Sequence, residues 1–160
     1  MRSRMATVAM KTAFCLCLRP GLVELFGLKW SNFDFARGSV TIRQGKSGIL
    51  KTVIPPKAYM EEAALRCNED TAIGQELVCT KNGKRVTCYS DAWHRACRQA
   101  GVRMRPYDIR HLAATTMIAA GADISSVAAQ LGHQNCAITG KFYAHVTSSG
   151  QRNAGQALAM

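Results

Sequence analysis

The strongest constraint on the fold comes from residues 107–133, which carry two consecutive helical patterns. In the first pattern, small or apolar residues recur at a spacing of three or four up to Gly121: Ile109, Leu112, Ala113, Thr116, Met117 and Ala120. Asp123 is a suitable N-cap for the second helix, in which Ile124, Val127, Ala128 and Leu131 form the apolar face. Gly132 ends that helix and places His133 at its exit, so this stretch of the chain predicts two consecutive helices.

The remaining residues predict further helices and one β-hairpin. Helices are expected from about residues 4 to 18, 22 to 27, 56 to 68 and 93 to 100. Residues 38–56 alternate, with Val40, Ile42 and Val53 on one face around the turn at residues 45–48, which predicts a hairpin with Lys46 at its tip. A short strand at residues 77–80 and a turn at residues 81–83 follow. We therefore expect a mainly α fold with a small antiparallel sheet, in the α+β class.

The charge of the chain favours a polyanionic partner. Lys and Arg total 21 against 10 for Asp and Glu, which gives a formal net charge of +11. An anionic membrane is the weaker candidate, because the best apolar run, residues 13–18, is far below the ~20 residues that a span needs. The first residues imitate a signal peptide, but Lys11 interrupts the apolar centre and the cleavage pattern is missing. We expect a nucleic-acid partner, no membrane, and a location in the cytoplasm.

Length and cysteine pattern indicate a single domain without a metal centre or a disulfide framework. The 160 residues are 48% hydrophobic, enough for one core, and no repeat or linker divides them. The seven cysteines lack the Cys-x-x-Cys spacing of a zinc site, so we interpret them as small core residues in a reducing cytoplasm. Cys15 and Cys17 could instead form a redox pair, although one intervening residue in an apolar helix fits core filling better.

Four stretches of the chain resemble tyrosine recombinases of the phage integrase family, in family order. They are LRPGLVELFGLKWSNFDF, GKSGILKTVIPP, YDIRHLAATTMIAAGADISSVAAQLGH and ITGKFYAHV. The resemblance implies the tyrosine-recombinase catalytic-domain fold and six site residues, namely Arg19, Lys46, Tyr107, Arg110, His133 and the nucleophile Tyr143. It implies an enzyme that cuts and rejoins DNA through a covalent 3′-phosphotyrosine, without metal, ATP or another cofactor.

These residue types suit the chemistry of phosphodiester exchange. Two guanidiniums can chelate the non-bridging oxygens and neutralise the charge of a pentacoordinate phosphorus, which is the role that Arg19 and Arg110 take. A phenol that titrates near ~10 needs help to ionise, and His133 and Tyr107 are the neighbours available to Tyr143. Lys46 takes the role of general acid that protonates the leaving 5′ oxygen.

Three positions depart from the family pattern. Tyr107 stands where the family has His, and a phenol titrates near ~10 and not near ~6.5, which questions a proton-accepting role. Glu24 lies two positions later than the family carboxylate expected to support the first arginine. The stretch from His133 to Tyr143 is one residue longer than is typical.

The resemblance also implies partners and surroundings for the domain. These are duplex DNA with recombination sites, and a homo-tetramer on that DNA whose protomers exchange a tail that begins near Gln156. Residues 1–160 then form one catalytic domain, the C-terminal part of a prophage or mobile-element integrase without its amino-terminal core-binding and arm-binding domains. The enzyme would be associated with the nucleoid when bound to DNA.

Each candidate residue also has a purely structural explanation. Arg19 could be a helix-end cation, Lys46 a solvated turn residue, Arg110 the partner of Asp108 in a surface ion pair, and Tyr143 a packed aromatic. Tyr107 could serve structure alone, while His111 and His145 fit structural neighbours better than catalysts. At the level of function, the alternatives are a catalytically impaired DNA-binding remnant, a type IB topoisomerase-like strand transferase, and a basic domain that binds nucleic acid without forming a covalent adduct.

Overall fold

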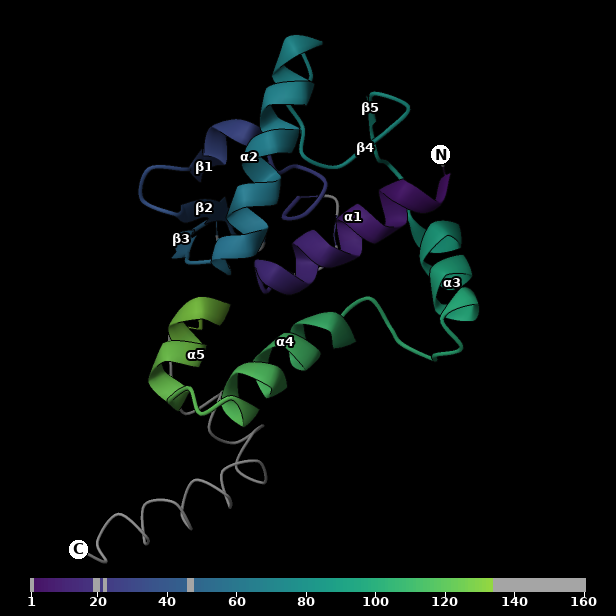
Figure 1. Cartoon of the computed structure of the whole chain (residues 1–160). Coiled ribbons are helices and arrows are strands. Elements are labelled where there is room, and N and C mark those ends of the chain that lie inside the picture. Colours follow the sequence, from purple (N-terminus) through teal and green to yellow (C-terminus); the bar gives the residue numbers. More distant parts are fainter. Residues whose placement is uncertain (1, 19–20, 22, 46–47, 134–160) are drawn as a thin grey trace, which may run out of the picture.

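A computed structural model describes residues 2–18, 21, 23–45 and 48–133. Within these residues the chain forms five α-helices and two small antiparallel sheets, in agreement with the α+β class expected from the sequence (Figure 1). The elements, in chain order, are α1 (Arg2–Cys15), the 3-10 turn η1 (Trp30–Asn32), β1 (Phe33–Asp34), β2 (Ser39–Arg43), β3 (Leu50–Val53), α2 (Lys57–Ala72), β4 (Thr80–Lys81), β5 (Lys84–Arg85), α3 (Ser90–Gln99), α4 (Asp108–Ala119) and α5 (Ile124–Leu131).

The predicted β-hairpin is confirmed. β1, β2 and β3 form an antiparallel sheet in that order, and Val40 of β2 faces Val53 of β3. Val40, Ile42 and Val53 are buried, because the alternation of the strands turns all three toward the helices. The tip residues Lys46 and Ser47 lie outside the described residues.

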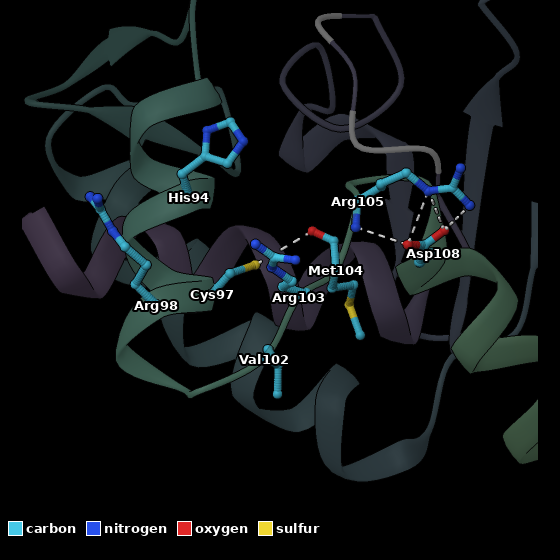
Figure 2. Close-up of a pocket in the computed structure, with 8 residues that line it drawn as sticks. All are labelled: His94, Cys97, Arg98, Val102, Arg103, Met104, Arg105 and Asp108. Carbon is cyan, nitrogen blue, oxygen red and sulfur yellow. Dashed lines mark hydrogen bonds and ion pairs between the residues drawn. The ribbon is translucent and has the colours of Figure 1, made fainter.

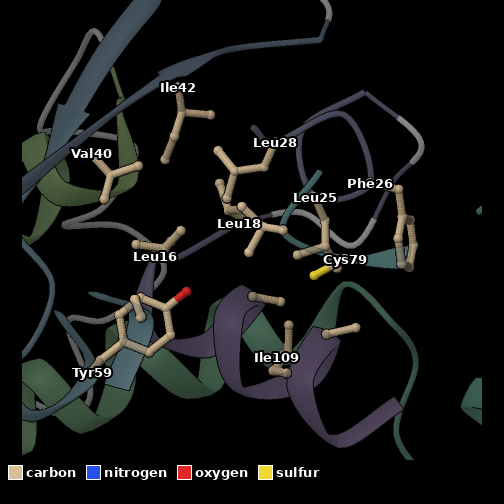
Figure 3. Close-up of a cluster of buried hydrophobic side chains, with 14 of the residues drawn as sticks. Leu16, Leu18, Leu25, Phe26, Leu28, Val40, Ile42, Tyr59, Cys79 and Ile109 are labelled. Carbon is tan, nitrogen blue, oxygen red and sulfur yellow. The ribbon is translucent and has the colours of Figure 1, made fainter. Parts of the chain in front are cut away.

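A large apolar cluster joins the helices to the sheet. α1 runs through the middle of the domain and packs against both α3 and α4, while β3 packs against α5 (Figure 1). Figure 3 shows Leu16, Leu18, Leu25 and Leu28 packed among side chains from the sheet and the helices. At the edge of this cluster the Tyr59 hydroxyl donates to Oγ1 of Thr12 at 3.1 Å, which satisfies both buried hydroxyls.

A second apolar cluster joins α4 and α5 to the end of α1. Its buried members are Cys17, Ala113, Ala114, Ile118, Val127 and Leu131. The predicted face of α4 is wrong in part, since Leu112 is 46% exposed while Ala114 is fully buried. The buried side of α4 combines Ala113 and Ala114 with the larger Ile109 and Ile118, so it is rotated relative to the predicted face.

Several predicted boundaries also change. Residues 23–27 form turns and not the predicted short helix, although the amide of Leu25 donates to the carbonyl of Gly21 at 3.2 Å. α2 continues to Ala72, four residues beyond the predicted end. The predicted strand at residues 77–80 is reduced to β4 and one bridge from Leu77 to Lys29. Cys17, Cys79 and Cys97 are buried as predicted, whereas Cys88 is exposed.

Candidate active site

The structure describes three of the six predicted site residues. Tyr107, Arg110 and His133 are placed at the start of α4 and the exit of α5. The other three, Arg19, Lys46 and Tyr143, lie outside the described residues. The segments that lead to Arg19 and Lys46 are described, so the surroundings of the site can be built from Cys17, Gln44 and Arg110.

Arg110 is the centre of the site. It lies in the first turn of α4 and is only 5% exposed. One guanidinium nitrogen, Nη1, donates to the carbonyl of Cys17 at 2.9 Å, and Nη2 donates to the carbonyl of Leu131. Both acceptors are neutral, so these two bonds fix the orientation of the guanidinium and leave its charge intact. The alternative of a surface pair with Asp108 is wrong, because Arg110 is buried and Asp108 pairs with Arg105 at 2.9 Å.

The end of α1 forms a tight turn directly before Arg19. The amide of Leu18 donates to the carbonyl of Ala13 at 2.8 Å and that of Cys17 to Phe14 at 3.1 Å, which is the Schellman pattern of a helix C-terminus. Cys17 occupies the left-handed position with a φ of 50°, where glycine is the usual residue. This turn points the Cys17 carbonyl at Arg110, so the chain reaches Arg19 from a fixed starting point.

The buried Cys17 thiol lies in a positively charged environment. Burial raises the pKa of this thiol, while the charges of Lys51 and Arg110 act in the opposite direction. Lys51 and Arg110 share this neighbourhood, since both contact the carbonyl of Leu131.

The exit of α5 repeats the same turn with the usual residue. Gly132 has a φ of 70°, and the amide of His133 donates to the carbonyl of Ala128 at 2.9 Å. The amide of Ser126 donates to the Asp123 side chain at 2.9 Å, which confirms the predicted N-cap at the other end of the helix. Both ends of α5 are therefore fixed by local hydrogen bonds, and His133 follows its last turn as the sequence predicts.

The β2–β3 hairpin is docked on this exit. Nε2 of Gln44, at the end of β2, donates to the carbonyl of Gly132 at 2.9 Å. Nζ of Lys51 on β3 lies 3.4 Å from the carbonyl of Leu131, the same oxygen that Arg110 contacts. These contacts bring together three segments that are far apart in the sequence, each two residues before one of the predicted residues Arg19, Lys46 and His133.

Tyr107 lies on the rim of this cluster. Its side chain is 40% exposed, and its ring meets the ring of His111 edge to face with centroids 4.9 Å apart. Its carbonyl accepts the amide of Arg110 at 3.2 Å, which ties Tyr107 to the turn that carries the arginine. An accessible phenol one turn before Arg110 is compatible with a contact to a bound substrate, as well as with a structural role.

Glu24 contacts the hairpin. Its Oε1 accepts the amide of Gly45 at 3.3 Å, directly before Lys46 in the sequence. Arg19, which the family carboxylate is expected to support, lies outside the described part of the chain, so a role of Glu24 beside Arg19 stays a prediction.

A basic pocket leads away from the start of α4. Figure 2 shows it between α3, which contributes His94, Cys97 and Arg98, and the segment from Val102 to Arg105. The carbonyl of Met104 accepts from Nε1 of Trp93 at 2.7 Å, so the segment is held along α3. Arg98 and Arg103 line the pocket, and Arg105 turns to Asp108 at its edge.

Sequence reasoning missed Gln44 and Lys51. The signal for Lys51 was the strand alternation, because β3 is buried at Lys51 and Val53 and exposed at Leu50 and Thr52. A lysine on the inward face of a strand is unusual and needs a partner. Its partner is a carbonyl eighty positions later in the chain, which spacing alone does not reveal.

Comparison with solved structures shows that the fold is that of a tyrosine recombinase catalytic domain. The chain superposes on a XerH site-specific recombinase bound to its palindromic difH substrate with a TM-score of 0.72 and 21% identity, covering 100% of this chain and 48% of the other. It superposes on the catalytic domain of bacteriophage HP1 integrase with a TM-score of 0.66 and 18% identity, covering 93% of this chain and 79% of the other.

Sequence comparison gives the family. A profile of the phage integrase family matches residues 2–149, and the chain belongs to this family. It is 31% identical to a tyrosine recombinase XerA from Thermococcus onnurineus, over 82% of this chain and 48% of that relative. The chain spans about half the length of the XerA relatives it matches.

None of the described helices is both long enough and apolar enough to cross a membrane. In the same residues, His, Cys, Asp and Glu side chains form no group of three or more that could hold a metal ion.

Proposed function

We propose that the chain is the catalytic domain of a site-specific DNA recombinase or integrase, which cuts and rejoins DNA strands through Tyr143. The observation that carries the proposal is the setting of Arg110, whose guanidinium bonds to carbonyls that precede Arg19 and His133. A buried, oriented guanidinium in a low-dielectric site stabilises developing negative charge far better than one in water. Membership of the phage integrase family supports the same function.

The proposed reaction is a transesterification at phosphorus. The Tyr143 oxygen attacks the phosphodiester, forms a bond from phosphorus to the phenolic oxygen, and expels the 5′ oxygen of the next nucleotide. The proton on the phenol passes to one of its two candidate neighbours, His133 or Tyr107. Lys46 gives a proton to the leaving oxygen. Arg19 and Arg110 bind the non-bridging oxygens during the step. The 5′ hydroxyl of another strand reverses the reaction, and neither step draws on ATP, a metal ion or another cofactor.

Duplex DNA is the proposed partner. The net charge of +11 and the basic pocket beside α3 both suit a polyanion, because each phosphate bound to Lys or Arg releases counterions. We further propose that residues 1–160 act as one catalytic domain in the bacterial cytoplasm, at the nucleoid when bound to DNA, and that four protomers assemble on the recombination site. In that assembly the tail from Gln156 would pass to a neighbouring protomer. Chains cut after Ser149 that still assemble normally on DNA would count against the exchange.

The test is covalent capture of DNA. The chain is incubated with nicked suicide duplexes that carry candidate attachment sites, with and without a chelator, and the products are separated on denaturing gels. We expect a protein–DNA band that resists the chelator and is absent from Tyr143→Phe. Measurable DNA binding with no covalent band on any duplex would contradict the proposal and favour an impaired remnant. Relaxation of supercoiled plasmid that lacks a recombination site would instead favour a topoisomerase.

A further inference from the structure

Gln44 and Lys51 form one contact between the hairpin and the end of α5. Both side chains reach from the β2–β3 hairpin to consecutive carbonyls, those of Gly132 and Leu131. We name the four residues Gln44, Lys51, Leu131 and Gly132 the hairpin clamp. In the sequence, Gln44 and Lys51 flank the hairpin tip, and Gly132 directly precedes His133.

The chemistry of a helix C-terminus explains why these donors are there. The last carbonyls of a helix have no partner within the helix, and they lie at the negative end of its dipole. In α5, the amides of Gly132 and His133 satisfy the carbonyls of Ala129 and Ala128. The Leu131 carbonyl receives two positively charged groups, from Arg110 and Lys51.

The fit of the clamp is tight. A Cβ atom on Gly132 would lie 2.4 Å from Nε2 of Gln44 and 2.6 Å from Cδ of Lys51. Lys51 is only 8% exposed, so its aliphatic stem is packed and its ammonium group is withdrawn from bulk water. A charged side chain is rarely retained at such burial unless it contacts specific polar groups.

We propose that Gln44 and Lys51 are positioning residues that set where the hairpin lysine, Lys46, stands relative to His133 and Arg110. This inference rests on the proposed function. Lys51 contacts the carbonyl that also orients Arg110, and the arginine has a second anchor at the Cys17 carbonyl, so loss of the Lys51 contact frees the hairpin while Arg110 stays held. With the clamp in place, the acid at the leaving oxygen and the arginine at the phosphorus are held at one fixed separation, which a proton transfer between positioned groups requires.

A second contact between β3 and α5 supplies the matched control. Gln130 of α5 accepts the amide of Ile54 at 3.1 Å and donates to its carbonyl at 2.6 Å. This reciprocal pair also fastens the sheet to the helix, but it lies beyond the end of β3 farther from the hairpin tip, and Ile54 is 70% exposed. Gln130→Ala therefore weakens the same interface and leaves the clamp in place.

The test uses two leaving groups in the cleavage step. A suicide duplex that the unaltered chain cleaves is prepared with either the normal 5′ oxygen or a 5′ bridging sulfur at the scissile phosphate, since a thiolate leaves without a general acid. Single-turnover rates are measured for Lys51→Met, which keeps an unbranched stem and removes the ammonium group, for Gln130→Ala, and for Lys46→Ala as the reference for a lost acid.

Lys51→Met should lower the rate about 10- to 100-fold with the oxygen leaving group and less than about 3-fold with sulfur. Gln130→Ala should change both rates less than about 3-fold, in keeping with its separate contact. Equal losses of Lys51→Met on both duplexes, or no loss on either, would overturn the proposal, as would an equal effect of Gln130→Ala.

A measurement without DNA keeps the clamp testable if the unaltered chain forms no adduct or Lys46→Ala shows no sulfur rescue. Either of those outcomes refutes part of the proposed function, and the hairpin clamp is then tested by amide hydrogen exchange. The amide of Gly48 donates to the carbonyl of Gln44 at 2.9 Å, and that of His133 to Ala128 at 2.9 Å. Lys51→Met should speed exchange at both amides at least about fivefold, since both ends of the clamp loosen together. Unchanged exchange at either amide would overturn the proposal.

Discussion

Replacing Gly132 with alanine tests the packing at the exit of α5. Gly132 has a φ of +70°, and a left-handed conformation costs a non-glycine residue about 1–2 kcal/mol. The new Cβ would also lie 2.4 Å from Gln44 Nε2 and 2.6 Å from Lys51 Cδ, so both side chains must move. Overpacking of this kind costs about 1–3 kcal/mol. The sum is a loss of about 2–5 kcal/mol in the free energy of unfolding.

Gly101 provides the control for the backbone contribution. It ends α3 in the same kind of turn with a φ of +67°, and a Cβ there meets nothing within 4 Å. Gly101→Ala should therefore lose only the conformational contribution of about 1–2 kcal/mol. Urea unfolding followed by the fluorescence of Trp30 and Trp93, which are 7% and 5% exposed, measures both variants. Equal losses in the two variants would refute the reasoning, because the clamp would then offer no resistance to the added methyl group.

Three further predictions concern the cap, the DNA surface and the rim of the site. Hydrogen bonds from Ser126 lower the pKa of the Asp123 carboxyl, so Asp123 stabilises the fold above about pH 4 and loses that effect as pH falls through the lowered pKa. Asp123→Ala should lower the urea midpoint at pH 7 and approach the parent chain below about pH 4; equal midpoints at pH 7 would contradict the cap. Charge reversal of Arg98 and Arg103 together should reduce the slope of log affinity for DNA against log salt concentration by about 1.8, whereas Lys57→Glu on α2 should not change it. An unchanged slope in the double variant would show that the pocket does not contact DNA. Tyr107→His should add an inflection near ~6.5 to the pH profile of the cleavage rate, and a profile without that inflection would indicate a purely structural role at this position.

Local signals explain what the sequence predicted correctly. The two ends of α5, at Asp123 and Gly132, were predictable because a cap and a left-handed turn depend on residues within one helical turn. The hairpin follows from its alternation, and Val40 faces Val53 as a shared inner face requires. The turn at Asn82 and Gly83 was also predictable, because Asn-Gly favours a turn in which both residues have positive φ values. The observed values are 53° and 71°.

Contacts distant in sequence explain what the sequence missed. Helix α4 buries Ala114 and exposes Leu112 because α1 and α5 pack on the side of Ala114, a choice that periodicity alone does not settle. The end of α1 uses Cys17 in a left-handed turn, so the helix ends at Cys15, whereas the sequence predicted that it continues to residue 18. The resemblance to tyrosine recombinases singled out Arg110, but its burial against the carbonyls of two other segments was not predictable from the sequence.

The hairpin clamp shows the same difference between local signals and contacts distant in sequence. Strand alternation puts Lys51 on the same inward face as Val53, two residues later. The carbonyl that it meets comes from α5, which packs on β3 only in the folded chain. Lys51 and Leu131 were both visible in the sequence, whereas the contact between them was not.

The most direct test of the central claim is to identify the amino acid that carries the DNA. After covalent capture on a suicide duplex, nuclease and trypsin treatment followed by mass spectrometry should yield peptide 142–152 carrying a nucleotide through a 3′ phosphate on Tyr143. The same linkage on peptide 104–110 would assign the chemistry to Tyr107, the 40% exposed phenol beside Arg110, and would contradict the account. A nucleotide on Tyr143 alone, with a free 5′ hydroxyl on the released strand, is the result that the account predicts.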